Sequence, residues 1–64
     1  MPIGVTDSVY NAMNNIYMKA YNDEPSVANG KSDAATKGSA AGKNALLNAG
    51  YSAEQINAYL SRKG

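Results

Sequence analysis

The fold is decided by residues 45–63, which read ALLNAGYSAEQINAYLSRK. Gly50 stands where a glycine ends a helix in the left-handed conformation, and Ser52 stands where an N-cap begins the next one. Gln55 follows Ser52 at the spacing of a capping box, in which each side chain accepts a hydrogen bond from the other residue's backbone. Tyr51 lies between these two signals. The stretch therefore predicts two helices that meet at a tight turn, the second of them over residues 53–63.

Tyr51 is expected to connect these two helices. It falls at the position that packs back on Leu46 in the first helix, and also at the position that packs forward on Ile56 in the second. We therefore expect Tyr51 to be the aromatic residue most sensitive to replacement. The predicted structural turn comprises Leu46, Gly50, Tyr51, Ser52, Gln55 and Ile56.

A helix is also predicted over residues 7–23. Thr6 is a suitable N-cap, and Pro25 biases Glu24 away from the helical region, so the helix should end by about residue 23. At about 100° per residue, its large apolar side chains other than Met18 gather within an arc of about 140°. A short helical hairpin does not easily cover so wide an arc, and we therefore expect an interaction face. This face comprises Val9, Tyr10, Met13, Ile16, Tyr17 and Tyr21.

Residues 26–44 change in composition to Ala, Gly, Ser, Lys, Asn and Asp, and Val27 is their one large apolar side chain. Small residues recur at spacings of three and four, as they would along one stripe of a helix over residues 33–49. Against this, Gly38 and Gly42 each cost such a helix about 1 kcal/mol relative to alanine. The sequence leaves two alternatives open, a helix stabilised by a partner and a flexible linker.

The sequence offers no residues typical of catalysis or metal binding. Cys and His are absent, which excludes disulfides, thiolate or imidazole zinc ligands, and Cys or His nucleophiles. The acidic residues fit helix starts or an exposed turn, with Asp7 and Asp33 as candidate caps, so no carboxylate cluster indicates acid–base chemistry or a calcium loop. We expect no enzyme, no cofactor, and no catalytic or metal-binding residue.

The segment Asn29-Gly30-Lys31-Ser32 is similar to the end of a phosphate-binding loop. Pro25 occupies the place of that motif's first glycine, and no strand precedes it. We interpret the segment as a turn, in which Ser32 is a further candidate N-cap.

A chain of 64 residues makes one small domain, residues 1–64, with a thin core and marginal stability when alone. The composition predicts an all-α fold of two to three short helices, arranged as a small hairpin or bundle. Small scaffolds without disulfides or metals commonly depend on association. We therefore expect a protein partner or a homo-oligomer.

Charge makes nucleic acid an unlikely partner, and hydropathy argues against a membrane. The net charge of +1 gives no basic excess for nucleic acid, and no apolar run approaches the roughly 18 residues of a membrane span. We expect no secretion leader and no membrane association. The predicted location is the cytoplasm, or a particle assembled there.

Residues 45–62 resemble the helix-turn-helix of repressors of the lactose-repressor type. Ala49-Gly50-Tyr51-Ser52 matches the Ala-Gly-Val-Ser turn of that family, and Ile56 and Tyr59 match its later core positions. This resemblance implies DNA binding, although Leu46 replaces a small residue and Ala53-Glu54 falls where base-reading residues lie. The same stretch is also similar to the C-terminal helical hairpin of many bacterial proteins, which implies self-association.

The predicted function is that of a non-enzymatic, small helical structural or interaction protein. We expect it to dock on a larger assembly, such as a virion or another multi-subunit particle, or to self-associate. The alternative is a small helix-turn-helix-like DNA-binding or regulatory protein.

Overall fold

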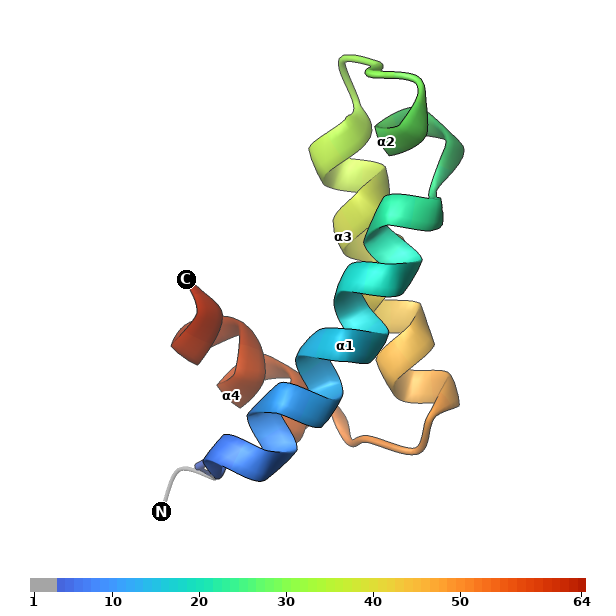
Figure 1. Ribbon diagram of the computed structural model, residues 1–64. Coiled ribbons are helices and arrows are strands. Elements are labelled where there is room, and N and C mark those ends of the chain that lie inside the picture. Colours follow the sequence, from blue (N-terminus) through green and yellow to red (C-terminus); the bar gives the residue numbers. More distant parts are fainter. Residues whose placement is uncertain (1–3) are drawn as a thin grey trace.

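The computed structural model describes residues 4–64, and its helices are α1 (Asp7–Asp23), α2 (Pro25–Ala28), α3 (Ala34–Asn48) and α4 (Ala53–Lys63). Helices α1 and α3 lie side by side and antiparallel, α2 closes one end of this pair, and α4 crosses α1 near the other end (Figure 1). The molecule is elongated, with extents of 39 × 17 × 17 Å. The all-α prediction is confirmed, and α1 and α4 have the predicted bounds.

Helix α1 begins and ends at the residues that its sequence indicates. The hydroxyl of Thr6 accepts a hydrogen bond from the backbone N–H of Val9 at 3.2 Å, so Thr6 is the N-cap. Glu24 is extended at ψ 126°, as a residue before proline prefers, and this ends the helix. Its carboxylate then accepts a hydrogen bond from the N–H of Ser26 at 3.3 Å. Glu24 therefore separates α1 from α2 and caps the latter.

Helix α3 is formed, so the structure agrees with the helical alternative for this segment. Its two glycines are buried against tyrosine rings of α1: a Cβ at Gly38 would lie 2.7 Å from the ring of Tyr21, and one at Gly42 would overlap the ring of Tyr17. The stripe of small residues thus receives α1 of the same chain. Intrachain packing offsets the poor helix propensity of the glycines.

The start of α3 differs from the prediction. Asp33 occupies the N-cap position, but its side chain makes no capping hydrogen bond, and Ser32 is not the cap. The Asp33 carboxylate instead pairs with the ammonium of Lys37 at 3.2 Å. The hydrogen bond from Lys37 holds the pKa of Asp33 below its usual range. The side chain is therefore drawn along the helix surface, away from the N–H groups that it was expected to cap.

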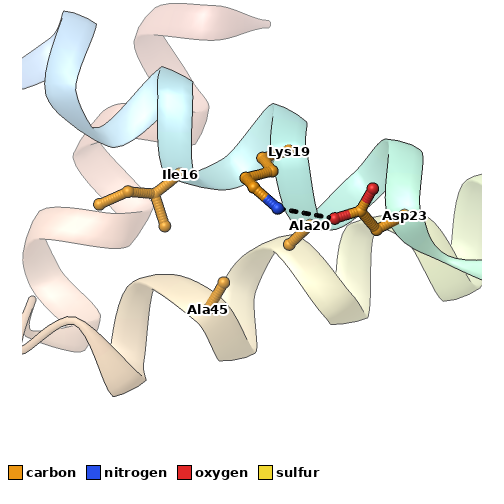
Figure 2. Close-up of a pocket in the computed structure, with 5 residues that line it drawn as sticks. All are labelled: Ile16, Lys19, Ala20, Asp23 and Ala45. Atoms are coloured by element: carbon orange, nitrogen blue, oxygen red, sulfur yellow. Dashed lines mark hydrogen bonds and ion pairs between the residues drawn. The ribbon is translucent and has the colours of Figure 1, made fainter.

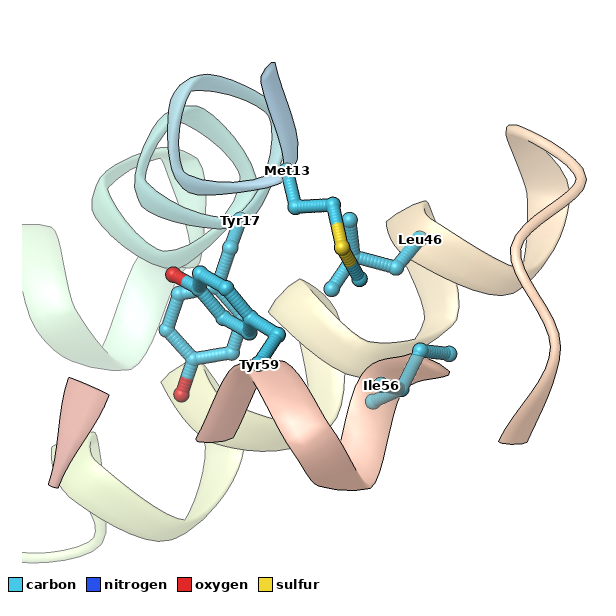
Figure 3. Packing of buried hydrophobic residues seen from close by; sticks show 5 residues of the cluster. All are labelled: Met13, Tyr17, Leu46, Ile56 and Tyr59. Carbon is cyan, nitrogen blue, oxygen red and sulfur yellow. The ribbon is translucent and has the colours of Figure 1, made fainter. Parts of the chain in front are cut away.

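The core is small and joins the three long helices. It consists of Met13 and Tyr17 from α1, Leu46 from α3, and Ile56 and Tyr59 from α4 (Figure 3). Half-buried side chains pack around it: Val5, Val9, Tyr10, Ile16, Met18, Tyr21, Tyr51 and Leu60. Tyr51 therefore contributes to the edge of the core, as the turn prediction requires, but is not among its buried members.

The turn between α3 and α4 has both predicted halves. Gly50 has φ 101°, its N–H donates to the carbonyl of Leu47 at 3.0 Å, and the N–H of Tyr51 donates to the carbonyl of Leu46 at 3.1 Å. These two bonds define a Schellman motif. Ser52 and Gln55 form the capping box, with bonds of 3.2 and 3.0 Å. Two interlocked caps thus fix where α4 starts.

Replacement of Gly50 by alanine is expected to destabilise the protein by about 1–2 kcal/mol, because a Cβ is unfavourable in the left-handed region. Nothing lies within 4 Å of the new methyl group, so backbone strain is the whole effect. Urea unfolding followed by circular dichroism measures it. A Gly50→Asn variant should recover part of the loss, because asparagine tolerates this conformation. Equal stability of Gly50→Ala and the parent protein would contradict the Schellman assignment.

Candidate interaction surface

The interaction face predicted on α1 is largely covered by the same chain. Met13 is 0% exposed and Tyr17 is 5% exposed, so both belong to the core. The other four residues, Val9, Tyr10, Ile16 and Tyr21, are half-buried and pack against that core. The expectation of an uncovered face is therefore wrong for Met13 and Tyr17. The physical reason is that Gly42 of α3 and the ring of Tyr59 from α4 receive Tyr17, while Met13 lies beside Leu46 in the core (Figure 3).

A hollow lies between one side of α1 and the neighbouring α3. Ile16 and Ala20 of α1 and Ala45 of α3 line it, and its volume is about 300 Å³ (Figure 2). Lys19 and Asp23 stand at its rim, where the ammonium donates to the carboxylate at 3.0 Å. Both charged side chains are mainly exposed, at 81% and 67%, so their pair contributes little to stability. The hollow therefore combines an apolar floor with charges that face solvent.

The tyrosines of α1 and α4 form a cluster on the core side of α1. The ring of Tyr59 lies 5.2 Å from that of Tyr10 and 5.4 Å from that of Tyr17, and Tyr21 continues the series 6.1 Å beyond Tyr17. Tilted rings at these distances attract one another beyond simple burial of area. This cluster joins α4 to α1.

Arg62 ties the end of α4 to the start of α1. Its guanidinium lies 4.5 Å from the ring centre of Tyr10, donates to the backbone carbonyl of Val5 at 3.0 Å, and pairs with the carboxylate of Asp7 at 2.5 Å. The sequence predicted Asp7 only as a cap and indicated no partner for Arg62. The missed contact joins residues 55 positions apart, and no local pattern reports such a contact.

Asn14 is a polar residue of this region that sequence reasoning missed. Its side-chain oxygen accepts hydrogen bonds from the hydroxyl of Tyr59 at 2.7 Å and from the ammonium of Lys63 at 2.9 Å. In the sequence, Asn14 directly follows Met13 and lies at the edge of the apolar arc. This position could have indicated that its side chain lies beside the core. Burial raises the pKa of Tyr59 to about 12, and the nearby Tyr10 and Tyr17 act in the same direction.

The raised pKa of Tyr59 predicts alkaline unfolding. The folded protein holds this phenol proton more tightly than the unfolded chain, in which tyrosine titrates near 10.0. The resulting stabilisation is complete below that pH and is lost as the pH rises through about 12. Helical content measured against pH should fall in this range, and less steeply in a Tyr59→Phe variant. An identical curve for that variant would mean that another group controls the transition.

Comparison with protein families, curated proteins and solved structures finds no match for this chain. Within residues 4–64, no group of three or more acidic side chains could hold a metal ion. Over the same range, no helix combines the length and the apolar character that crossing a membrane requires.

The positions that the helix-turn-helix resemblance would bring to DNA lie at the start of α4. Ala53 and Glu54 are exposed there, and neither of them is basic. The basic residues of α4, Arg62 and Lys63, lie at its other end, against the tyrosine cluster. The turn itself matches the resemblance, while the charge distribution around it does not favour a nucleic-acid surface.

Proposed function

We propose that this chain is a non-enzymatic structural or interaction protein, which docks on a larger assembly or on a second copy through the hollow between α1 and α3. The observation that supports this proposal is the hollow itself. Ile16, Ala20 and Ala45 line it outside the core, and the Lys19–Asp23 pair borders it. An apolar centre with a charged rim is the usual organisation of a protein interface.

The character of the hollow favours a protein side chain over a small molecule. At about 300 Å³ it stands at the lower end of ligand pockets. The residues at its floor are an isoleucine and two alanines, which offer no converging polar side chains to orient a ligand. An apolar side chain projecting from a partner would fill it without requiring a polar contact.

The size of the chain also supports a dependence on a partner. A chain of 6.7 kDa buries a smaller fraction of its surface on folding than a larger protein does. The core has only five buried side chains, and no disulfide adds to it within the described residues. A partner that binds only the folded chain would add to its stability. We propose a multi-subunit particle assembled in the cytoplasm, such as a virion, as that larger assembly.

A matched pair of variants tests the docking surface. Ala20→Arg would fill the hollow with a long charged side chain, whereas Ala40→Arg places the same side chain at an exposed position of α3. We expect Ala20→Arg to weaken self-association or particle binding at least about tenfold, a loss of about 1.4 kcal/mol, and Ala40→Arg to leave it unchanged. Sedimentation measures the association, and circular dichroism checks that both variants remain helical.

Two outcomes would contradict the proposal. In the first, both variants associate as the parent protein does, and the hollow is then not the docking surface. In the second, the chain stays monomeric, co-purifies with no particle, and binds duplex DNA with an affinity that falls as salt rises. That result would favour the DNA-binding alternative.

A further inference from the structure

Asn29 and Gly30 form an exposed turn between α2 and α3, at the end of the molecule opposite α4 (Figure 1). Asn29 is the C-cap of α2, with φ −98° and ψ 6°, and Gly30 follows in the left-handed region at φ 63°. Neither residue belongs to the hollow or to the tyrosine cluster. The turn joins a nucleophilic backbone nitrogen to an amide side chain in an open setting.

We propose that Asn29 is a site of spontaneous covalent modification, deamidation through a cyclic imide. The backbone nitrogen of Gly30 attacks the side-chain carbon Cγ of Asn29, and the new C–N bond closes a five-membered succinimide ring. The proton of the backbone nitrogen is lost, and the side-chain nitrogen leaves as ammonia. One water molecule then opens the ring at either carbonyl, which gives aspartate or isoaspartate at this position. No other reactant is required.

Two features distinguish Asn29 from the other asparagines. It alone is followed by glycine, whereas the residue after each of the others carries a Cβ that crowds the attacking nitrogen. Apart from its two chain neighbours, nothing lies within 4 Å of the place where a Cβ of Gly30 would stand, so no other segment of the chain packs on this side of the turn. In addition, Asn29 lies just outside a helix. The other asparagines lie within α1, α3 or α4, namely Asn11, Asn14, Asn15, Asn22, Asn44, Asn48 and Asn57.

The local structure sets a small barrier to this reaction. The N–H of Gly30 donates to the carbonyl of Val27 at 3.2 Å, and the N–H of Asn29 donates to the carbonyl of Pro25 at 2.9 Å. The first bond must open before the nitrogen can turn toward the side chain. Helix α2 has only four residues, and the ends of short helices open at little cost. Fraying of this one turn is sufficient, and the core stays intact.

The modification would change the charge and the length of the turn. One added carboxylate beside Lys31 lowers the formal net charge from +1 to zero. Isoaspartate also adds one carbon to the backbone between α2 and α3. The helical content of the protein should stay unchanged, because the five residues of the hydrophobic core lie in α1, α3 and α4.

The experiment follows the native full-length chain in mildly alkaline buffer, with peptide mapping by mass spectrometry. We expect a gain of one mass unit in the peptide that ends at Lys31, assigned to Asn29 rather than Asn22 by fragmentation. It should form as a mixture of aspartate and isoaspartate, at least about tenfold faster than any gain at a helical asparagine, whose opening costs more. An Asn29→Gln variant is the matched control and should lose the gain, because glutamine would have to close a larger ring.

Three results would overturn the proposal. One is conversion at a helical asparagine as fast as at Asn29. Another is conversion of Asn29 in urea-unfolded chain with none in the native protein, since this would show that the Gly30–Val27 hydrogen bond protects the turn. A native chain that shows no gain at any asparagine would contradict it equally.

Discussion

Replacement of Tyr59 by alanine is expected to unfold the isolated chain. The ring is 0% exposed and stands where α4 meets α1, between the rings of Tyr10 and Tyr17. Truncation of a buried aromatic side chain costs about 3–5 kcal/mol. A single core of this size rarely supplies more than about 3–5 kcal/mol in total. The far-ultraviolet circular dichroism of Tyr59→Ala should therefore show loss of most helix at room temperature.

Two control variants separate the ring from its hydroxyl and from its position. Tyr59→Phe keeps the ring and removes the hydrogen bond to Asn14, at an expected cost of about 1 kcal/mol. Tyr51→Ala truncates a half-buried ring and should cost less than Tyr59→Ala. A Tyr59→Ala protein that stays folded with a loss below about 1 kcal/mol would contradict the assigned core. The prediction that Tyr51 is the most sensitive aromatic residue thus gives way to Tyr59.

Replacement of Gly42 by alanine is expected to destabilise the protein by about 1–3 kcal/mol, although the same change in an exposed helix is stabilising. The new methyl group would overlap the ring of Tyr17, which is buried and has no room to withdraw. Helix α1 would have to move away from α3, with loss of contacts along the whole pair. Urea unfolding followed by circular dichroism gives the change in free energy.

Gly38→Ala is the matched control for this prediction. Its methyl group would also crowd a ring, that of Tyr21, but this ring is half-buried and lies at the edge of the core. Since it can turn toward solvent, the loss should be smaller than for Gly42→Ala. A stabilised Gly42→Ala protein would show that the ring of Tyr17 does not pack directly on Gly42.

Local signals in the sequence were sufficient for α1, α4 and the turn before α4. Thr6, Pro25, Gly50 and the Ser52–Gln55 pair act within four residues of themselves, so their effect can be read without the rest of the chain. Helix α2 was missed because Pro25 was interpreted only as the end of α1. Proline is also favoured in the first turn of a helix, as it is in α2.

The formation of α3 and the contacts between the ends of the chain depend on long-range contacts, which local sequence signals do not predict. Helix α3 depends on tyrosines about twenty residues away in α1, and its own composition disfavours a helix. The bonds of Arg62 to Asp7 and of Tyr59 to Asn14 likewise join opposite ends of the chain. Of the predicted interaction face, Ile16 alone lines the hollow, while Met13 and Tyr17 are buried in the core and Val9, Tyr10 and Tyr21 pack at its edge.

Tyr17 and Tyr21 lie one turn apart on α1, and Gly42 and Gly38, against which they pack, lie one turn apart on the antiparallel α3. A slide of α1 along α3 by one turn, about 5.4 Å, would bring Tyr17 over Gly38. Tyr21 would then meet Ala34, which is also small. The small residues Ala34, Gly38 and Gly42 by themselves therefore allow two alignments of the helix pair.

A slide in the opposite direction would bring Tyr17 against Leu46, which is too large to receive it. Met13, Leu46 and Tyr59, the fully buried residues, thus select one alignment from the two that the stripe accepts. A chain whose core is weakened without loss of its helices would be free to exchange between the two. In the intact protein, the side chains at the α4 end therefore hold the helix pair in one of two alignments that differ by a single helical turn.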